Sequence, residues 1–179
     1  MSKILVTGGA GFIGYFLIKE LLKNKNNKIV MVDNMCRGRM DDDLKKIISN
    51  KNIIFYDGDL TDNNLFSSLD KDFDYIYHLA AVIGVKNVIE NPDKVLRDNA
   101  MVTLNLIEFA KKIKSLKKVL FSSTSEIYAG TLKHFGIEIP TNENVKLTLD
   151  DIKSPRTTYM LSKMYGESIL FNYGSKYNI

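Results

Sequence analysis

The sequence predicts an α/β fold, a doubly wound parallel sheet with helices on both faces. Short apolar runs rich in β-branched residues recur along the chain, and helical patterns separate most of them. A glycine-rich turn follows the first run and opens the first helical pattern. Strands that alternate with helices favour a parallel sheet, and strands buried on both faces read as nearly continuous apolar runs.

The composition indicates one globular domain over residues 1–179. Apolar residues make up 45% of the chain and charged residues 26%, and 179 residues suffice to build a buried core. Lysine and arginine number 25 against 21 acidic residues, and the basic residues are scattered rather than gathered in a patch. We therefore expect no nucleic-acid partner.

The N-terminal residues and the single cysteine bear on location. The apolar run that follows Met1 is too short for a signal peptide or a membrane span, so we expect neither export nor a membrane anchor. Cys36 has no partner for an intramolecular disulfide, and no cysteine–histidine cluster has the spacing of metal ligands. We expect a reducing, cytoplasmic setting and no metal.

The apolar runs predict five strands, and the periodic segments predict four helices. The strands are expected at residues 4–7, 29–33, 53–56, 75–79 and 119–122, and the helices at residues 12–23, 63–69, 92–113 and 159–173. Thr61 and Asp62 can cap the second helix, and Pro92 suits the first turn of the third. Residues 129–157 have mixed polarity and two prolines, so we expect a long loop, which in compact domains is usually functional.

The glycine-rich turn, TGGAGFIG at residues 7–14, is typical of dinucleotide sites in Rossmann-type folds. Gly8 allows the tight turn, Gly11 lets the backbone approach a pyrophosphate, and Gly14 permits close packing of the helix on the strand. The helix N-terminus that follows offers free N–H groups and a positive dipole end to phosphates. A glycine-rich turn without a ligand is the alternative, and the strand–turn–helix context argues against it.

Asp33 ends the second predicted strand, about twenty residues after the turn. A carboxylate there can accept hydrogen bonds from the adenosine ribose and would repel a 2′-phosphate, which favours NAD over NADP. Arg37 and Arg39 follow closely and could soften that repulsion, and an ordinary turn residue is the alternative for Asp33. Cys36, in the same loop, is expected to be a passive wall residue.

Further motifs follow the other predicted strands in a fixed order. They are Asp33-Asn34, Asp59-Leu60, His78-Leu79-Ala80-Ala81, Asn99, Ser122-Ser123-Thr124 and Tyr159-Met160-Leu161-Ser162-Lys163. With the glycine turn, they resemble the extended short-chain dehydrogenase/reductase family, in its NAD-dependent nucleotide-sugar epimerase/dehydratase group, over nearly the whole chain. The resemblance implies an NAD site made of Gly8, Gly11, Phe12, Ile13, Gly14, Asp33, Asn34, Asp59, Leu60, Leu79, Ala80, Ala81, Asn99, Ser122, Tyr159 and Lys163.

Tyr159 and Lys163 lie four residues apart on a predicted helix, so both side chains project from one face. We expect the ammonium of Lys163 to lower the pKa of Tyr159, which makes Tyr159 a candidate general base. The resemblance implies that Tyr159 takes the proton of a sugar 4-hydroxyl while hydride leaves C4, that Thr124 hydrogen-bonds the same oxygen, and that Lys163 reaches the nicotinamide ribose. A half-buried tyrosine beside a solvated lysine is the alternative. His78 is expected to be a packed strand residue.

Glu126 bears on the reaction. The triplet Thr124-Ser125-Glu126 resembles that of sugar-nucleotide 4,6-dehydratases and UDP-glucuronate decarboxylases, whereas 4-epimerases usually have a small or neutral residue there. A carboxylate so placed could take the C5 proton once a 4-keto group has acidified it. The alternative is that Glu126 only supports the loop. Ala129, Met160 and Leu161 depart from the usual pattern and put the substrate in doubt more than the mechanism.

The resemblance also implies a missing part and a partner. Family members continue past the last helix into a subdomain that binds the nucleotide-sugar, whether UDP-, GDP- or dTDP-linked, and this chain is expected to lack it. Relatives pair through the two long helices, so a homodimer is expected to use the apolar face of Val95, Val102, Leu106 and Phe109. A non-catalytic dinucleotide-binding module and an NAD-linked alcohol reductase are rival hypotheses.

Overall fold

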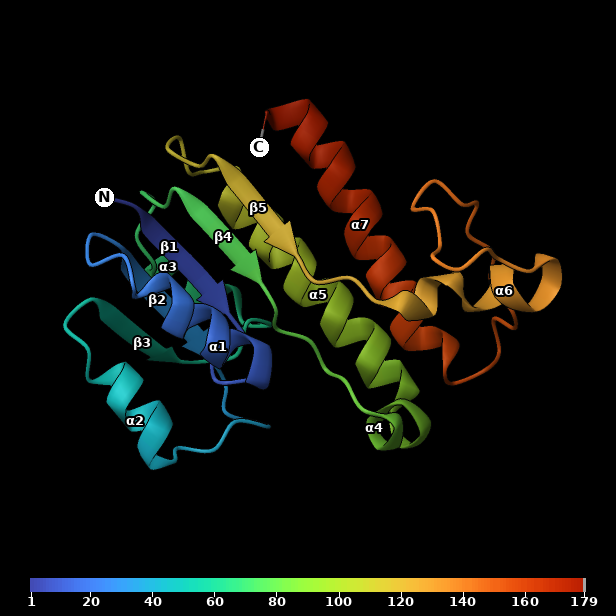
Figure 1. Cartoon of the computed structure of the whole chain (residues 1–179), viewed down its shortest axis with the longest axis horizontal. Coiled ribbons are helices and arrows are strands. Elements are labelled where there is room, and N and C mark those ends of the chain that lie inside the picture. The colour runs from blue at the N-terminus through green and yellow to red at the C-terminus, as the bar shows by residue number, and fades with distance from the viewer. Residues whose placement is uncertain (179) are drawn as a thin grey trace.

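Five parallel strands form one sheet in the computed structural model, which describes residues 1–178 (Figure 1). The strands are β1 (Lys3–Thr7), β2 (Lys28–Asp33), β3 (Ile53–Asp57), β4 (Tyr75–His78) and β5 (Lys118–Phe121). They lie in the order β3-β2-β1-β4-β5, and every neighbouring pair is parallel. The predicted strands are confirmed, with ends within one residue of those observed.

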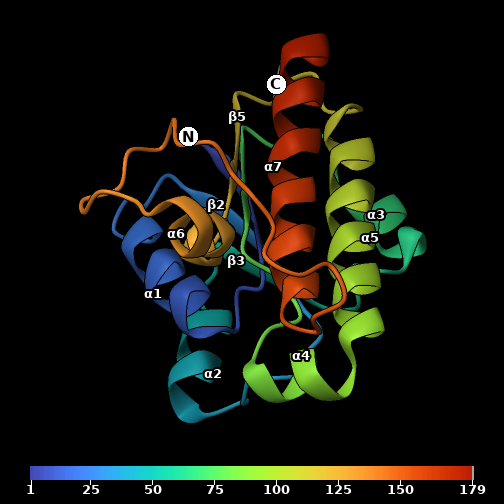
Figure 2. The same ribbon diagram turned by 90° about the vertical axis from the view of Figure 1, so that its right-hand side faces the viewer.

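Helices cover both faces of this sheet, as the sequence predicts. Alternate residues of β1 point to opposite faces: Ile4 and Val6 pack in one core with α1 (Phe12–Leu21) and α2 (Asp42–Ile48). Leu5 packs in the other core, which holds buried residues of α3 (Asn63–Ser68) and α5 (Pro92–Ala110) and the partly buried side of α7 (Thr157–Tyr177). Figure 2 shows α5 and α7 side by side on one face and α1 on the other.

The four predicted helices correspond to α1, α3, α5 and α7. Asp62 is the N-cap of α3, where its carboxylate accepts a hydrogen bond from the Asn64 amide at 2.8 Å, and Pro92 is the first residue of α5. Both expected start signals are therefore confirmed. Helix α7 begins two residues before the predicted start and continues to Tyr177.

Three further helices and a 3₁₀ turn were not predicted. Helix α2 has sequence signals that were overlooked: Asp41 caps it by accepting from the Leu44 amide at 2.8 Å, and acidic residues open it. The others are α4 (Val85–Glu90), η1 (Ser125–Tyr128) and α6 (Ala129–Phe135).

Helix α6 corrects the expectation of an uninterrupted loop over residues 129–157. The helix is fixed by tertiary contacts rather than by an amphipathic period. The Thr131 hydroxyl donates to the Lys146 carbonyl at 2.8 Å, and Gly130 lies so close to the Thr148 backbone that a Cβ would clash with it. The segment is thus folded back on itself.

The expected dimer face of α5 is wrong in its residues. Val95, Val102, Leu106 and Phe109 are at most 8% exposed within this one chain, because that side of α5 covers the sheet. The large apolar residues that α5 leaves exposed are Met101, at 39%, and Leu104, at 38%.

The order of the strands in the sheet indicates where a ligand would bind. The connections from β1 and from β4 leave in opposite directions at the centre of the sheet, and ligands of open α/β sheets bind at such a switch point, beyond the carboxyl ends of the strands. The glycine turn follows β1 there, and residues 79–84 follow β4. No helix in residues 1–178 is long and apolar enough to cross a membrane.

Candidate active site

The glycine turn lies directly against the loop that follows β4. Gly8 has φ +72°, and a Cβ on it would lie 2.7 Å from the Ala80 nitrogen and 2.9 Å from the Leu79 carbonyl carbon. Gly14 is equally confined, because a Cβ there would clash with the Gly8 carbonyl oxygen. These contacts show that Gly8 and Gly14 are required by packing of the turn itself.

Gly11 differs from its two neighbours in the motif. It is the N-cap of α1, has extended backbone angles and offers no side-chain cap, and a Cβ on it would approach only the Gly8 oxygen, at 3.3 Å. The amides of Phe12 and Ile13 precede the first i to i−4 bond of α1, from Tyr15 to Gly11, so they have no acceptor within the helix. Space in front of Gly11 and free N–H groups behind it suit a phosphate group.

Asp33, at the end of β2, is held beside this turn. One carboxylate oxygen accepts from the Ala10 amide at 3.0 Å and the other from the Met35 amide at 2.9 Å. Met35 takes φ +55°, which bends the chain around the carboxylate. The carboxylate keeps further lone pairs for donors such as ribose hydroxyls. Burial and the charges of Asp33 and Asp59 raise the pKa of the nearby Cys36 thiol, so this cysteine lacks thiolate character.

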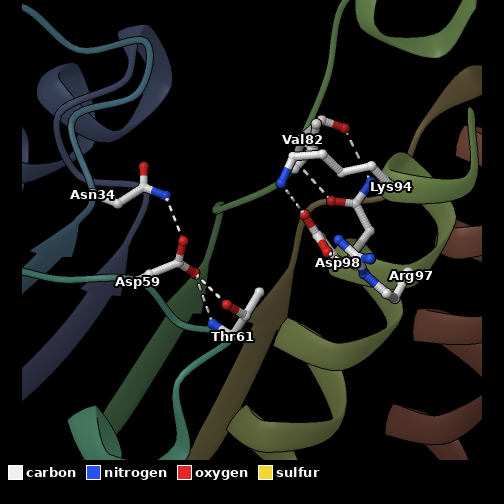
Figure 3. A network of polar contacts seen from close by, with 8 residues as sticks. Asn34, Asp59, Thr61, Val82, Lys94, Arg97 and Asp98 are labelled. Carbon is white, nitrogen blue, oxygen red and sulfur yellow. Dashed lines mark hydrogen bonds and ion pairs between the residues drawn. The ribbon is translucent and has the colours of Figure 1, made fainter. Parts of the chain in front are cut away.

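Asp59 forms a second acidic position, after β3 (Figure 3). Its carboxylate accepts from the Thr61 amide and hydroxyl, both at 2.8 Å, and from the Asn34 side chain at 3.2 Å. Burial alone would raise the pKa of this carboxyl, but these hydrogen bonds hold it below its ordinary value. Asn34 therefore joins the loops after β2 and β3, while the neighbouring Leu60 side chain is buried in the core.

Asn99 lies on α5 and fastens the loop after β4. Its side-chain oxygen accepts from the Val82 amide at 2.6 Å, and its NH₂ group donates to the Val82 carbonyl at 3.0 Å and to the Ser162 hydroxyl at 3.3 Å. The neighbouring Asp98 is buried and paired with Lys94 and Arg97 (Figure 3). Ala80 and Ala81 are part of the fastened loop, with Ala80 against Gly8.

Lys163 is buried at the carboxyl end of β5. Its side chain is covered by protein, and its Nζ donates to the Ser122 carbonyl at 2.7 Å and lies 4.7 Å from the centre of the Phe121 ring. Burial lowers the pKa of this ammonium to about 8. Gly166, one turn along α7, leaves room for the Phe121 ring against the helix.

Tyr159 lies on the same side of α7, and the Lys163 Nζ is 5.8 Å from the centre of its ring. The expectation that Lys163 lowers the pKa of Tyr159 is wrong for this state of the protein: burial and the charge of Glu126 raise that pKa. The reason is that the lysine donates to the Ser122 carbonyl instead of facing the phenol oxygen.

Glu126 and Thr124 complete the group at the end of β5. Thr124 is the N-cap of η1, and its hydroxyl accepts from the Glu126 amide at 3.3 Å. Helix α7, which carries Tyr159, contacts η1, which carries Glu126, and the charge of Glu126 contributes to the raised pKa of Tyr159. A cavity of about 1010 Å³ begins at Ser123, Thr124 and Ser125 and extends between β5 and α7.

His78 is a packed strand residue, as expected. It is 1% exposed, its Nδ1 lies 2.7 Å from the Thr7 hydroxyl, and its ring packs on Phe121. Burial and the nearby Lys163 charge lower the pKa of the imidazole to about 3, so it is neutral near pH 7. Sequence reasoning missed Ser162, whose hydroxyl joins Asn99 to the Tyr159 carbonyl. Its position between Tyr159 and Lys163 was the one available signal.

A pH titration of stability tests the burial of Lys163. The folded-state pKa of about 8 lies below the ordinary lysine value of 10.5, so the unfolded chain binds more protons between these values and the free energy of unfolding should rise with pH there. We expect the wild-type curve to rise by about 3 kcal/mol relative to Lys163→Met. Lys176→Met, which removes an exposed lysine of α7, should leave the slope unchanged, and parallel curves for Lys163→Met and wild type would contradict the burial.

Comparison with known proteins agrees with this geometry. A family model described as the NAD dependent epimerase/dehydratase family matches residues 4–179. UDP-glucuronic acid decarboxylase 6 of Arabidopsis thaliana is 34% identical over 177 residues, which cover 99% of this chain and 48% of the relative. The dTDP-D-glucose 4,6-dehydratase of Dictyostelium discoideum is 31% identical over 182 residues, which cover 100% of this chain and 42% of the relative.

Solved structures of nucleotide-sugar epimerases and related enzymes also match this chain. The UDP-Glc/GlcNAc 4-epimerase of Campylobacter jejuni matches with a TM-score of 0.81 at 30% identity, over 98% of this chain and 50% of that one. The Bordetella bronchiseptica enzyme WbmF in complex with NAD⁺ matches with a TM-score of 0.78 at 28% identity, over 99% and 47%. The chain spans about half the length of the curated relatives it matches. The chain belongs to the NAD-dependent epimerase/dehydratase family.

Proposed function

We propose that this chain is the NAD-binding and proton-transfer part of a nucleotide-sugar epimerase/dehydratase. One observation carries the proposal: Tyr159, Lys163, Thr124 and Glu126 gather at the carboxyl end of the sheet that also carries the glycine turn. A turn alone would support only binding, and a Tyr–Lys pair alone would suit many helices. Their presence at one end of one sheet supports catalysis on a ligand held there.

The residues present fit NAD. Gly11 and the first amides of α1 would hold the pyrophosphate, because the space before Gly11 is open and those N–H groups lack helical acceptors. Asp33 would accept from the adenosine ribose, and Asp59 with Leu60 would lie near the adenine. When bound, NAD supplies a hydride acceptor that returns the hydride later, so no net cofactor is consumed.

The proton chemistry falls to Tyr159. In the present geometry burial and Glu126 keep its phenol protonated, and Lys163 is turned to Ser122. For Tyr159 to act as a base, its pKa must fall, and the Lys163 ammonium, 5.8 Å from the centre of its ring, is a group that would lower it on turning toward the phenol oxygen. Tyr159 would then take the proton of the substrate hydroxyl, and the Thr124 hydroxyl would hydrogen-bond the same oxygen.

Glu126 favours elimination over simple epimerisation. Its carboxylate lies on η1, which contacts the helix that carries Tyr159, and would make a second proton transfer, at C5 of a 4-keto sugar. A decarboxylase acting on UDP-glucuronate is the second candidate, since that class resembles this chain in the Thr124-Ser125-Glu126 triplet. The free cysteine, Cys36, supports a cytoplasmic location for either enzyme.

Turnover assays with UDP-, GDP- and dTDP-linked sugars test the proposal. Tyr159→Phe should lower turnover by at least about a hundredfold while NAD binding is retained, because only the proton-transfer group is removed. Tyr177→Phe, an exposed tyrosine at the end of the same helix, is the matched control and should leave turnover unchanged. Product mass then detects loss of water or of carbon dioxide, and chromatography detects an epimer, whose mass equals that of the substrate. Glu126→Gln should abolish loss of water but spare epimerisation.

Two results would count against this function. Retained turnover in Tyr159→Phe would remove Tyr159 from catalysis. Binding of NAD without conversion of any sugar, by the chain joined to the sugar-binding part that its relatives carry, would favour a non-catalytic dinucleotide-binding module. Steady release of NADH would favour an alcohol reductase.

We further propose that two copies of the chain pair through α5 and α7. The proposal is supported by the family resemblance and by exposed apolar residues on these adjacent helices: Met101, Leu104 and Tyr165. Sedimentation analysis should find a dimer that Leu104→Glu converts to a monomer, because a charge would be buried in the interface. A monomer at all concentrations of the unaltered chain would overturn the pairing.

A further inference from the structure

Two asparagines of α5 are almost completely buried, and their side chains form hydrogen bonds with loops rather than with the helix itself. Asn99 is 5% exposed and Asn105 is 8% exposed. An amide side chain loses hydrogen bonds to water when it is buried, so it needs partners inside the protein. The partners of these two residues lie in the two loops that flank the expected cofactor site.

Asn105 fastens the loop after β3. Its NH₂ group donates to the Leu60 carbonyl at 3.0 Å and to the Thr61 carbonyl at 3.2 Å. The same loop carries Asp59, whose carboxylate is fixed by Thr61 and Asn34. A shift of the Leu60 and Thr61 carbonyls would therefore move the Asp59 side chain with them.

Asn99 fastens the loop after β4 with both ends of its amide. It accepts from the Val82 amide and donates to the Val82 carbonyl, so the loop is held at one residue in both directions. The same NH₂ group reaches Ser162, whose hydroxyl donates to the Tyr159 carbonyl at 2.6 Å. Asn99 thus joins this loop to the turn of α7 that carries Tyr159 and Lys163.

We propose that Asn105 is a positioning residue, which holds the loop after β3 in place for dinucleotide binding without touching the ligand itself. Asn99, which the resemblance places in the NAD site, holds the loop after β4 in the same way, so the two side chains together set the separation of the two loops. Helix α5 is the rigid spacer, because its other face is packed in the core under the sheet. The inference rests on the proposed function in that NAD is the ligand. Beyond that function, the affinity for NAD would depend on two side chains whose hydrogen-bonding atoms bind the protein's own backbone.

Hydrogen exchange and NAD titration of the same variants test this role. Removal of a hydrogen bond should speed amide exchange locally by about three- to tenfold: in residues 80–84 for Asn99→Ala, and in residues 59–62 for Asn105→Ala. Each variant should also weaken NAD binding, measured by calorimetry, by about three- to tenfold.

Asn27→Ala is the matched control. Asn27 is also 8% exposed and donates to a backbone carbonyl, that of Leu21 at 2.9 Å, but it precedes β2 at the opposite end of the sheet. It should lower the melting temperature about as much as the other two variants and leave the NAD dissociation constant unchanged. If an alanine variant fails to fold, the leucine variant, which keeps the branched shape of the side chain but removes the amide, replaces it.

The outcomes are separable. Unchanged NAD affinity in Asn99→Ala and Asn105→Ala, or an equal loss in Asn27→Ala, would overturn the positioning role. Exchange that rises in both loops for either variant would overturn the assignment of one asparagine to each loop. If the unaltered chain does not bind NAD, the proposed function fails, while the exchange pattern still decides whether the asparagines fix the loops.

Discussion

The strands β1 and β4 end so close together at the centre of the sheet that the residue after β1 has no room for a side chain. Gly8 meets this constraint with a positive φ and lies against the backbone of Leu79 and Ala80. The same close packing brings the start of α1, the loop after β4 and the end of β5 to one edge. This packing would let one dinucleotide reach all of the acidic residues and the Tyr–Lys pair at that edge: Asp33, Asp59, Tyr159 and Lys163.

Helix α5 holds that edge in shape. Its apolar side is buried under the sheet, and its two buried asparagines tie down the loops after β3 and β4. Helix α7 is tied to the same frame through Ser162. The buried Lys163 ammonium, held by one carbonyl, is therefore positioned by contacts that extend from β5 to α5, and its low pKa follows from this burial.

The sheet, the four main helices and the grouping of motif residues could be predicted from the sequence, because buried parallel strands and a glycine turn have strong local signals. Helix α6 could not, because Gly130 and Thr131 are fixed by Thr148 and Lys146, which follow in the same segment after a fold of the chain that leaves no periodic signal. The raised pKa of Tyr159 could not either: a spacing of four residues places Lys163 on the same face but does not show that its ammonium donates to Ser122. Val95 and Leu106 were assigned to a partner for the same reason, since an apolar stripe does not reveal what covers it.

The central claim is that the glycine turn serves a ligand as well as the fold, and Gly11 separates the two roles. Its backbone angles suit any residue and a Cβ there meets only one atom, so Gly11→Val should fold with a melting temperature close to wild type. Calorimetric titration of NAD into wild type and Gly11→Val tests the claim most directly. The account predicts at least about a tenfold loss of affinity, because the valine side chain would occupy the place of the pyrophosphate. Unchanged affinity in a folded Gly11→Val variant would contradict it.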